Sequence, residues 1–283
     1  MKLVGEFNKP IEIAKQRLNM ISFQNTSKLN ALTEGLIKYS QSKSKNYDEN
    51  VRLVADDYQT ILPNNVNLII VPCGDINLFD SKIFKEALYH RFEQQIFNEE
   101  TTNLLYNKVE STIESFLNSL EIKNESYQVD FQSSNIVLKK LLGMFKPDFH
   151  NDLEDLNAIE QRKLFIDTLT STEKENVLVL LFPEAHLGLS DMKAFNKYLQ
   201  TLNMFSIIVT SHPYFIIESD TLALIKMNGE PVNTKQIREE LLLFKEKETI
   251  TDLDKTSKMI AYHEFCQHPY LDDEFFIQFM NKY

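Results

Sequence analysis

The fold of this chain is decided by an apolar run, VLVLLF at Val177–Phe182, that closes on Pro183-Glu184-Ala185-His186. A polar-started helical stretch follows at Ser190–Met204, and a second apolar run, Phe205–Val209, closes on Thr210-Ser211-His212. Two apolar runs joined by a crossover helix predict two buried parallel strands with polar groups at their carboxyl ends. This pattern is typical of an open α/β sheet with a site at that edge.

The composition places limits on the class of protein. The chain has 283 residues, of which 43% are apolar and 25% charged, as in ordinary globular proteins. No apolar run approaches the roughly 20 residues of a membrane-spanning helix, and the N-terminus shows no signal-peptide pattern. Two distant cysteines, Cys73 and Cys266, favour a reduced cytoplasm. The net charge of −11 excludes a surface that is basic all over, but not a local basic groove.

The chain is predicted to be an α/β protein of three parts. Residues 1–79 and 173–233 carry strand patterns and are expected to form one core with a mixed sheet. Residues 80–172 have long amphipathic patterns and predict a helical insertion, and residues 234–283 predict a C-terminal helical extension. The strand candidates are Met1–Phe7, Pro10–Ala14, Leu18–Phe23, Val51–Ala55, Val66–Pro72 and a hairpin at 221–232 that turns at Asn228-Gly229.

The order of strand, acid, helix, strand and histidine resembles the ATP-hydrolysing half of an ABC-type ATPase. In such an enzyme Glu184 would polarise the attacking water, and His212 would sense the γ-phosphate. The phosphate loop, G-x-x-x-x-G-K-[ST], is missing, because the first strand–helix junction, Phe23–Lys28, contains no glycine. We therefore expect no ATP binding or hydrolysis. The alternative for Glu184 is a polar residue that caps a strand end.

Clustered lysines are the candidates for DNA contact. Lys139, Lys140 and Lys146 flank the apolar face of a predicted helix at 135–145. Lys28 lies in the first turn of the helix that follows the first buried strand. Phosphate contacts need only mobile positive charge, so these lysines are the best candidates if the chain binds DNA. The alternative is that each cluster is a solvated helix face.

Acidic side chains near residue 125 are the candidates for a metal site. Glu121, Glu125 and Asp130 are close in sequence, and such oxygen ligands suit calcium. Their spacing fits no EF-hand, and the alternative is a solvated loop. A second group, His263, Cys266 and His268, has no common zinc spacing.

The overall arrangement resembles the Csn-two family, the CRISPR-associated spacer-acquisition proteins of type II-A systems. The resemblance covers roughly residues 1–230, and the C-terminal helices suggest a longer variant. Its elements are the N-terminal strand pair with Lys9–Ile13, the strand Asn19–Phe23 with its degenerate loop, Val66–Pro72 followed by inserted helices, the helix Ile136–Gly143, and Val177–Phe182 with Leu189-Ser190-Asp191 opening the crossover helix.

The resemblance implies a degenerate ABC-ATPase-like fold without a nucleotide site. It implies a ring-like homotetramer that threads linear double-stranded DNA, binds free ends and is stabilised by calcium. The implied role is non-enzymatic, in antiviral defence, beside the CRISPR integrase and the effector nuclease. The chain departs from the family in its acidic run, which is thinned to Glu125 and Asp130. Two other hypotheses remain open: a divergent ABC or DNA-repair-type ATPase, and an acidic α/β interaction scaffold.

Overall fold

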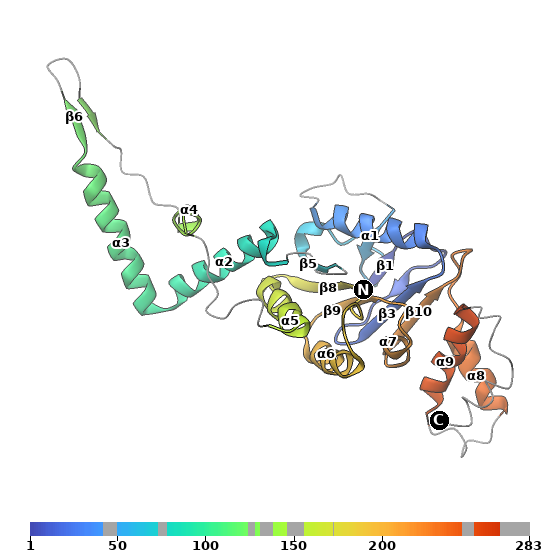
Figure 1. The fold of residues 1–283 in the computed structure, drawn as a ribbon. Helices are drawn as coiled ribbons and strands as arrows, with labels where there is room; N and C mark the ends of the chain where they lie inside the picture. Colours follow the sequence, from blue (N-terminus) through green and yellow to red (C-terminus); the bar gives the residue numbers. More distant parts are fainter. Residues whose placement is uncertain are drawn as a thin grey trace. The chain divides into compact units, whose positions relative to one another are not determined.

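The structure is a computed structural model that describes residues 1–41, 50–72, 78–123, 128–130, 138–145, 156–171, 173–244 and 252–266. The chain divides into two compact units (Figure 1). The core unit comprises residues 1–76 and 170–283, and the helical unit comprises residues 77–169. Within the described ranges, no helix combines the length and the apolar character needed to cross a lipid bilayer.

A parallel sheet of five strands runs through the core unit in the order β10-β3-β9-β8-β5. The prediction of two parallel strands around a crossover helix is confirmed, since Val177 of β8 lies opposite Phe205 of β9. All six residues of β3 are buried, as expected for a strand covered on both faces. The strands are β3 Leu18–Phe23, β5 Val66–Val71, β8 Glu175–Leu181, β9 Phe205–Val209 and β10 Thr221–Ile225.

The antiparallel strands form a sheet of their own, so the predicted mixed sheet is in fact two sheets. Its order is β2-β1-β4, with β1 at Lys2–Val4, β2 at Ile11–Glu12 and β4 at Arg52–Val54. Side chains of both sheets and of helix α1, Thr26–Gln41, share the main hydrophobic core. Tyr39 of α1 is fully buried, and its hydroxyl donates to the carbonyl of Ile61 at 2.6 Å.

Four further helices belong to the core unit: α6 Leu189–Thr201, α7 Pro213–Ile217, α8 Thr234–Phe244 and α9 Leu253–Cys266. Helix α6 is the crossover between β8 and β9. A second, smaller apolar cluster brings α7, β10 and α9 together, and its buried members include Ile216, Leu224 and Phe265. Because this cluster is separate from the main core, α9 is held partly by its own apolar contacts.

The hairpin predicted after β10 is present as a short turn. Lys226 N donates to Glu230 O at 2.8 Å, and Gly229 N donates to Lys226 O at 2.9 Å. Gly229 has a φ of 87°, the left-handed value that glycine adopts without cost in a three-residue hairpin loop. The returning chain forms an isolated antiparallel bridge between Ile225 and Pro231. The turn thus depends on glycine at position 229.

The helical unit begins with a short 3-10 helix, η2 Leu78–Asp80, before α2. Ser81 caps α2 by accepting from Phe84 N at 3.3 Å, and the Phe84 ring stacks on Phe165 of α5 with centroids 5.8 Å apart. Arg91 Nε donates to the carbonyl of Thr168 at 2.9 Å and joins the same two helices. The other elements are α2 Lys82–Asn98, α3 Glu100–Asn118, β6 Glu121–Lys123, β7 Gln128–Asp130, α4 Leu138–Leu142 and α5 Ala158–Leu169.

Replacing Gly229 by alanine is expected to lower the free energy of unfolding by about 1–2 kcal/mol, because an L-residue is strained in the left-handed region. An alanine Cβ would also meet the Lys28 ammonium, since it would lie 2.4 Å from Nζ. Urea denaturation followed by circular dichroism measures the change. Gly229→Asn is the matched control, because asparagine tolerates this conformation and should lose less stability. Equal losses for both variants would contradict the argument from backbone conformation.

Candidate functional site

The carboxyl ends of β8 and β9 meet at Glu184. Thr210 Oγ1 donates to Glu184 Oε2 at 2.9 Å, and Ser211 N makes a longer contact of 3.5 Å with Oε1. The turn that carries Glu184 is bracketed by two residues with positive φ, Phe182 at 50° and His186 at 62°. The structure therefore brings the predicted acid to the predicted edge, where its carboxylate accepts hydrogen bonds from the next strand end. The Glu184 carboxylate thus caps the end of β9 by accepting these hydrogen bonds.

His212, the predicted phosphate sensor, caps helix α7. Its Nδ1 accepts from Tyr214 N at 3.2 Å, and its own backbone N–H donates to Thr210 Oγ1 at 3.0 Å. The Nδ1 acceptor requires the neutral tautomer with its proton on Nε2. The Nδ1 atom of the imidazole therefore satisfies a helix N–H that would otherwise be unpaired.

The strand–helix junction where a phosphate loop would lie is held by side chains. Gln24 Oε1 accepts from Met227 N at 2.9 Å, and Gln24 Nε2 donates to the carbonyl of Phe265. Asn25 Oδ1 accepts from Ser27 N at 2.9 Å and so takes up a backbone N–H at the start of α1. Phosphate cradles need such N–H groups turned towards the ligand. The expected absence of ATP binding stays a prediction, and this geometry gives it a structural basis.

The C-terminal half of helix α9 is bonded to chain segments at the carboxyl ends of three strands of the sheet. Tyr262 Oη donates to the carbonyl of Ser211 at 2.7 Å, and Lys226 Nζ lies 2.5 Å from Glu264 Oε1. With Gln24, three strand ends are therefore bonded to one helix: β3, β9 and β10. In open parallel sheets this edge is the place where ligands bind. Burial raises the pKa of the Tyr262 phenol, so this hydroxyl stays a hydrogen-bond donor at neutral pH.

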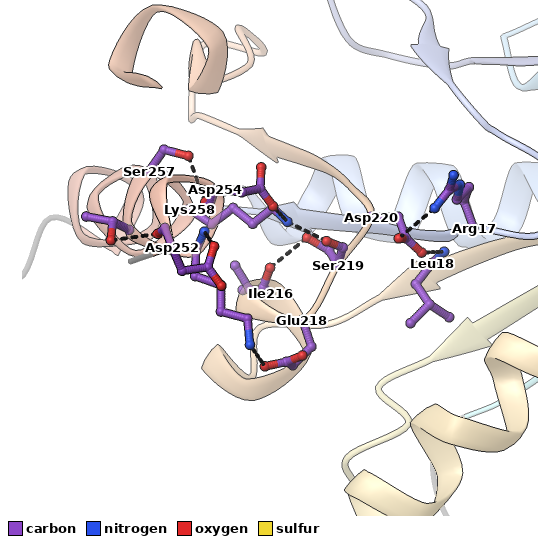
Figure 2. Close-up of polar contacts among 12 residues, drawn as sticks. Arg17, Leu18, Ile216, Glu218, Ser219, Asp220, Asp252, Asp254, Ser257 and Lys258 are labelled. Carbon is purple, nitrogen blue, oxygen red and sulfur yellow. Dashed lines mark hydrogen bonds and ion pairs between the residues drawn. The ribbon is translucent and has the colours of Figure 1, made fainter. Parts of the chain in front are cut away.

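The N-terminal half of α9 is fastened to the chain that leaves α7 (Figure 2). Lys258 is only 7% exposed, and its ammonium donates to the carbonyl of Ser219 and to the carboxylate of Asp254. Lys255 Nζ lies 2.8 Å from Glu218 Oε1, and this hydrogen bond raises the pKa of Lys255. A buried ammonium needs such partners, since an unpaired charge there would be costly. Both halves of α9 are thus bonded to the rest of the core unit.

The predicted DNA-binding lysines lie in different parts of the chain. Lys139 and Lys140 are exposed on α4 of the helical unit, and Lys146 lies outside the described residues. Lys28 is half-buried in the first turn of α1, with its ammonium beside Gly229 and Asn8. Lys28 belongs to the core unit, whereas Lys139 and Lys140 belong to the helical unit. Their role in DNA binding stays a prediction.

Two of the three predicted calcium ligands lie on facing strands. Glu121 of β6 and Asp130 of β7 are Cα partners in an antiparallel pair, and Glu125 lies outside the described residues. In the described part of the chain, no group of three His, Cys, Asp or Glu side chains is arranged to hold a metal ion. The calcium site therefore stays a prediction. Cys266 is partly buried, and this burial raises the pKa of its thiol.

The residues that close the edge, Gln24, Tyr262 and Glu264, were not among the sequence candidates. A signal for α9 was available, because Ala261 and Phe265 are apolar at helical spacing and Asp252 precedes the helix as a cap. Nothing in the sequence indicates where this helix packs.

The chain was compared with known proteins and structures. No protein-family model matches the chain, and no curated protein matches it. The crystal structure of Stu0660 of Streptococcus thermophilus matches with a TM-score of 0.66 and 14% identity, over 99% of this chain and 100% of that one. At this identity the similarity shows the fold alone.

Two ABC proteins match less well. A nucleotide-free ATP-binding cassette from an ABC transporter has a TM-score of 0.44 at 14% identity, over 82% of this chain and 90% of that one. A bacterial Atm1-family ABC exporter with ATP bound has a TM-score of 0.43 at 14% identity, over 96% of this chain and 41% of that one. TM-scores of 0.44 and 0.43 are too low for either match to support a conclusion about this chain.

Removing the Gln24 side chain is expected to destabilise α9 selectively. Gln24→Ala removes the hydrogen bonds to the Met227 N–H and the Phe265 carbonyl, each of which contributes a net free energy of about 0.5–1.5 kcal/mol. Hydrogen exchange measured by mass spectrometry should show faster exchange in 259–266 and unchanged protection in β3 and β9. Gln200→Ala, on the exposed side of α6, is the control and should change neither region. Unaltered exchange in α9 would contradict the role given to Gln24.

Proposed function

We propose that this chain is a non-enzymatic, double-stranded DNA-binding protein that acts in CRISPR spacer acquisition. The observation that carries the proposal is the similarity of fold to Stu0660 of Streptococcus thermophilus over nearly the whole of both chains, which agrees with the resemblance of the sequence to the Csn-two family. In this proposal the chain has a degenerate ABC-ATPase-like core and works in the cytoplasm beside the CRISPR integrase and the effector nuclease.

The chemistry at the carboxyl edge supports a role without catalysis. Glu184, which would have to act as a base in an ATPase, accepts hydrogen bonds from Thr210 and Ser211. Gln24 stands where the phosphate loop needs glycine, and it bonds to α9. A nucleotide bound at the β3–α1 junction would have to displace the contacts of Gln24. In this proposal, the residues at the carboxyl ends of the strands hold the fold together and do not catalyse a reaction.

An uncovered apolar stripe on α3 supports an oligomer. Leu105, Val109 and Phe116 are 59%, 43% and 61% exposed, and their spacing places them on one face of α3. Helix α3 has no buried residue in the described structure. A stripe of this kind is typical of a helix that packs against a partner. The proposed partner is a second copy of the chain, in a ring-like homotetramer.

Replacing Phe116 or Leu105 by glutamate is expected to dissociate the oligomer, because a buried carboxylate without a partner is strongly unfavourable. Size-exclusion chromatography with light scattering measures the mass of the particle. Ser111→Glu is the matched control, since Ser111 is exposed on the opposite face of α3. If the wild-type chain is monomeric, or if Phe116→Glu leaves the mass unchanged, α3 is not the oligomer interface.

Exposed lysines on the helical unit are proposed to contact DNA. Lys139 and Lys140 are both exposed on α4, and Lys146 follows them in the sequence. With a net charge of −11, binding must depend on such local positive charge. Calcium held near Glu121, Glu125 and Asp130 is proposed to stabilise the assembly, since oxygen ligands suit this ion.

The double variant Lys139→Gln/Lys140→Gln is expected to weaken binding to linear duplex DNA. Each lost phosphate contact should lower the slope of log K against log salt by about 0.9. Fluorescence anisotropy over a salt series measures both quantities, with and without calcium. The control is Lys193→Gln/Lys197→Gln, which removes two exposed lysines from α6.

The same assay tests the wider proposal. Equal binding of linear and closed-circular duplex would contradict threading over a free end. Absence of binding in all salt and calcium conditions would reject DNA binding and favour an acidic interaction scaffold. ATP turnover that is lost in Glu184→Gln would favour a divergent ATPase.

A further inference from the structure

A cavity of about 730 Å³ lies within the core unit beside β10. Strand β10 is at the edge of the parallel sheet and pairs only with β3 there. The cavity is lined by the N-terminal turn around Lys9, by β10, by the start of α8 and by the N-terminal half of α9. Its volume is within the usual range for small-ligand sites.

Positive side chains surround this cavity. Lys9, Lys235 and Arg238 line it and are exposed, and none of them forms an ion pair among the described residues. Lys235 and Arg238 are three positions apart on α8, so they share a face of the helix. Lys28 lies close by, because its ammonium is next to Gly229, whose carbonyl accepts from Asn8 N at 3.2 Å.

Four carboxylates also line the cavity, and two of them, Asp220 and Asp254, are paired with a cation. Asp220 accepts from Leu18 N at 2.7 Å and pairs with Arg17 at 3.4 Å, as Figure 2 shows. Asp254 is bonded to the ammonium of Lys258 (Figure 2), and Glu230 accepts from Asn228 Nδ2 at 3.0 Å. The fourth, Glu12, is the Cα partner of Lys2 in the β1–β2 pair, and its charge interacts with the Lys2 ammonium. Lys9, Lys235 and Arg238 have no ion pair in the described structure, so they outnumber the two lining carboxylates, Glu12 and Glu230, that lack a salt bridge there.

We propose that Lys9, Lys28, Lys235 and Arg238 form a phosphate-binding surface around this cavity. The guanidinium of Arg238 can bind two phosphate oxygens at once, and the lysines supply mobile point charges. The phosphate groups come either from a DNA backbone, in which case the inference rests on the proposed function, or from a free polyphosphate. This surface is distinct from the lysines of α4, which belong to the helical unit.

The test compares two probes, a short linear duplex followed by anisotropy and inorganic pyrophosphate followed by calorimetry. Lys235→Gln/Arg238→Gln is expected to weaken binding of the recognised probe by at least about tenfold, as the loss of two phosphate contacts predicts. Lys9→Gln, in a different segment, should weaken it by a smaller factor. The matched control is Lys193→Gln/Lys197→Gln on α6, which should change nothing. Urea denaturation verifies that each variant is folded.

The variant Glu12→Gln is expected to change the affinity for the recognised probe in the opposite direction. Removing this carboxylate, which has no salt bridge in the described structure, should tighten binding by about twofold to threefold, because it no longer repels the phosphate. Tighter binding is not expected if Glu12 has only a structural role. Weaker binding in Glu12→Gln would overturn the proposal.

The two probes separate this inference from the proposed function. If duplex binds and neither cation variant weakens it, and pyrophosphate does not bind, the inference is overturned and the proposed function stands. If pyrophosphate binds through Lys235 and Arg238 while duplex does not bind, the inference holds for a free polyphosphate and the proposed function fails. If duplex binds and depends on both residues, the surface is part of the DNA site. If neither probe binds, both proposals are rejected.

Discussion

The arrangement of the core unit depends on one buried carboxamide, that of Asn19 at the start of β3. Its Nδ2 donates to the carbonyls of Ala14, Arg17 and Ser206, and its Oδ1 accepts from Ala14 N and from Thr221 Oγ1 at 2.6 Å. A side chain that is 1% exposed thus joins the incoming chain, β9 and β10 to β3. Because every polar atom of the amide is satisfied, it specifies the order of three strands at little cost.

Gln24 has the corresponding position at the other end of β3. An amide can satisfy a donor and an acceptor at once, and here it joins the β10 turn to α9. A glycine-rich loop would leave backbone N–H groups free for a ligand, whereas this junction uses a side chain to recruit a helix. In open parallel sheets this end is where ligands bind, whereas here side-chain bonds to α9 occupy it. Glu184 and His212 have local partners of the same kind, as caps.

The sequence predicted those parts of the fold that are written in local patterns. The run Val177–Phe182 identified a strand buried on both faces, and Asn228-Gly229 identified a turn, since both signals depend on near neighbours. The prediction of one mixed sheet was wrong, because a strand pattern in the sequence does not say which sheet the strand joins. Helix α9 was predicted as a helix but not as a cover, because Gln24 and Phe265 are 241 residues apart.

The same distinction explains the limits on the candidate site. Lys139 and Lys140 stood out as neighbours in sequence. In contrast, Lys9, Lys235 and Arg238 are dispersed in the sequence and line one cavity only in the folded core unit, with Lys28 beside Gly229. The net charge likewise does not say where the charged side chains lie in the folded protein. A chain of charge −11 can still present positive side chains where its carboxylates are bound, as Asp220 and Asp254 are, to its own N–H groups and ammonium groups. Hydrogen bonding inside the fold therefore decides which charges remain available to a ligand.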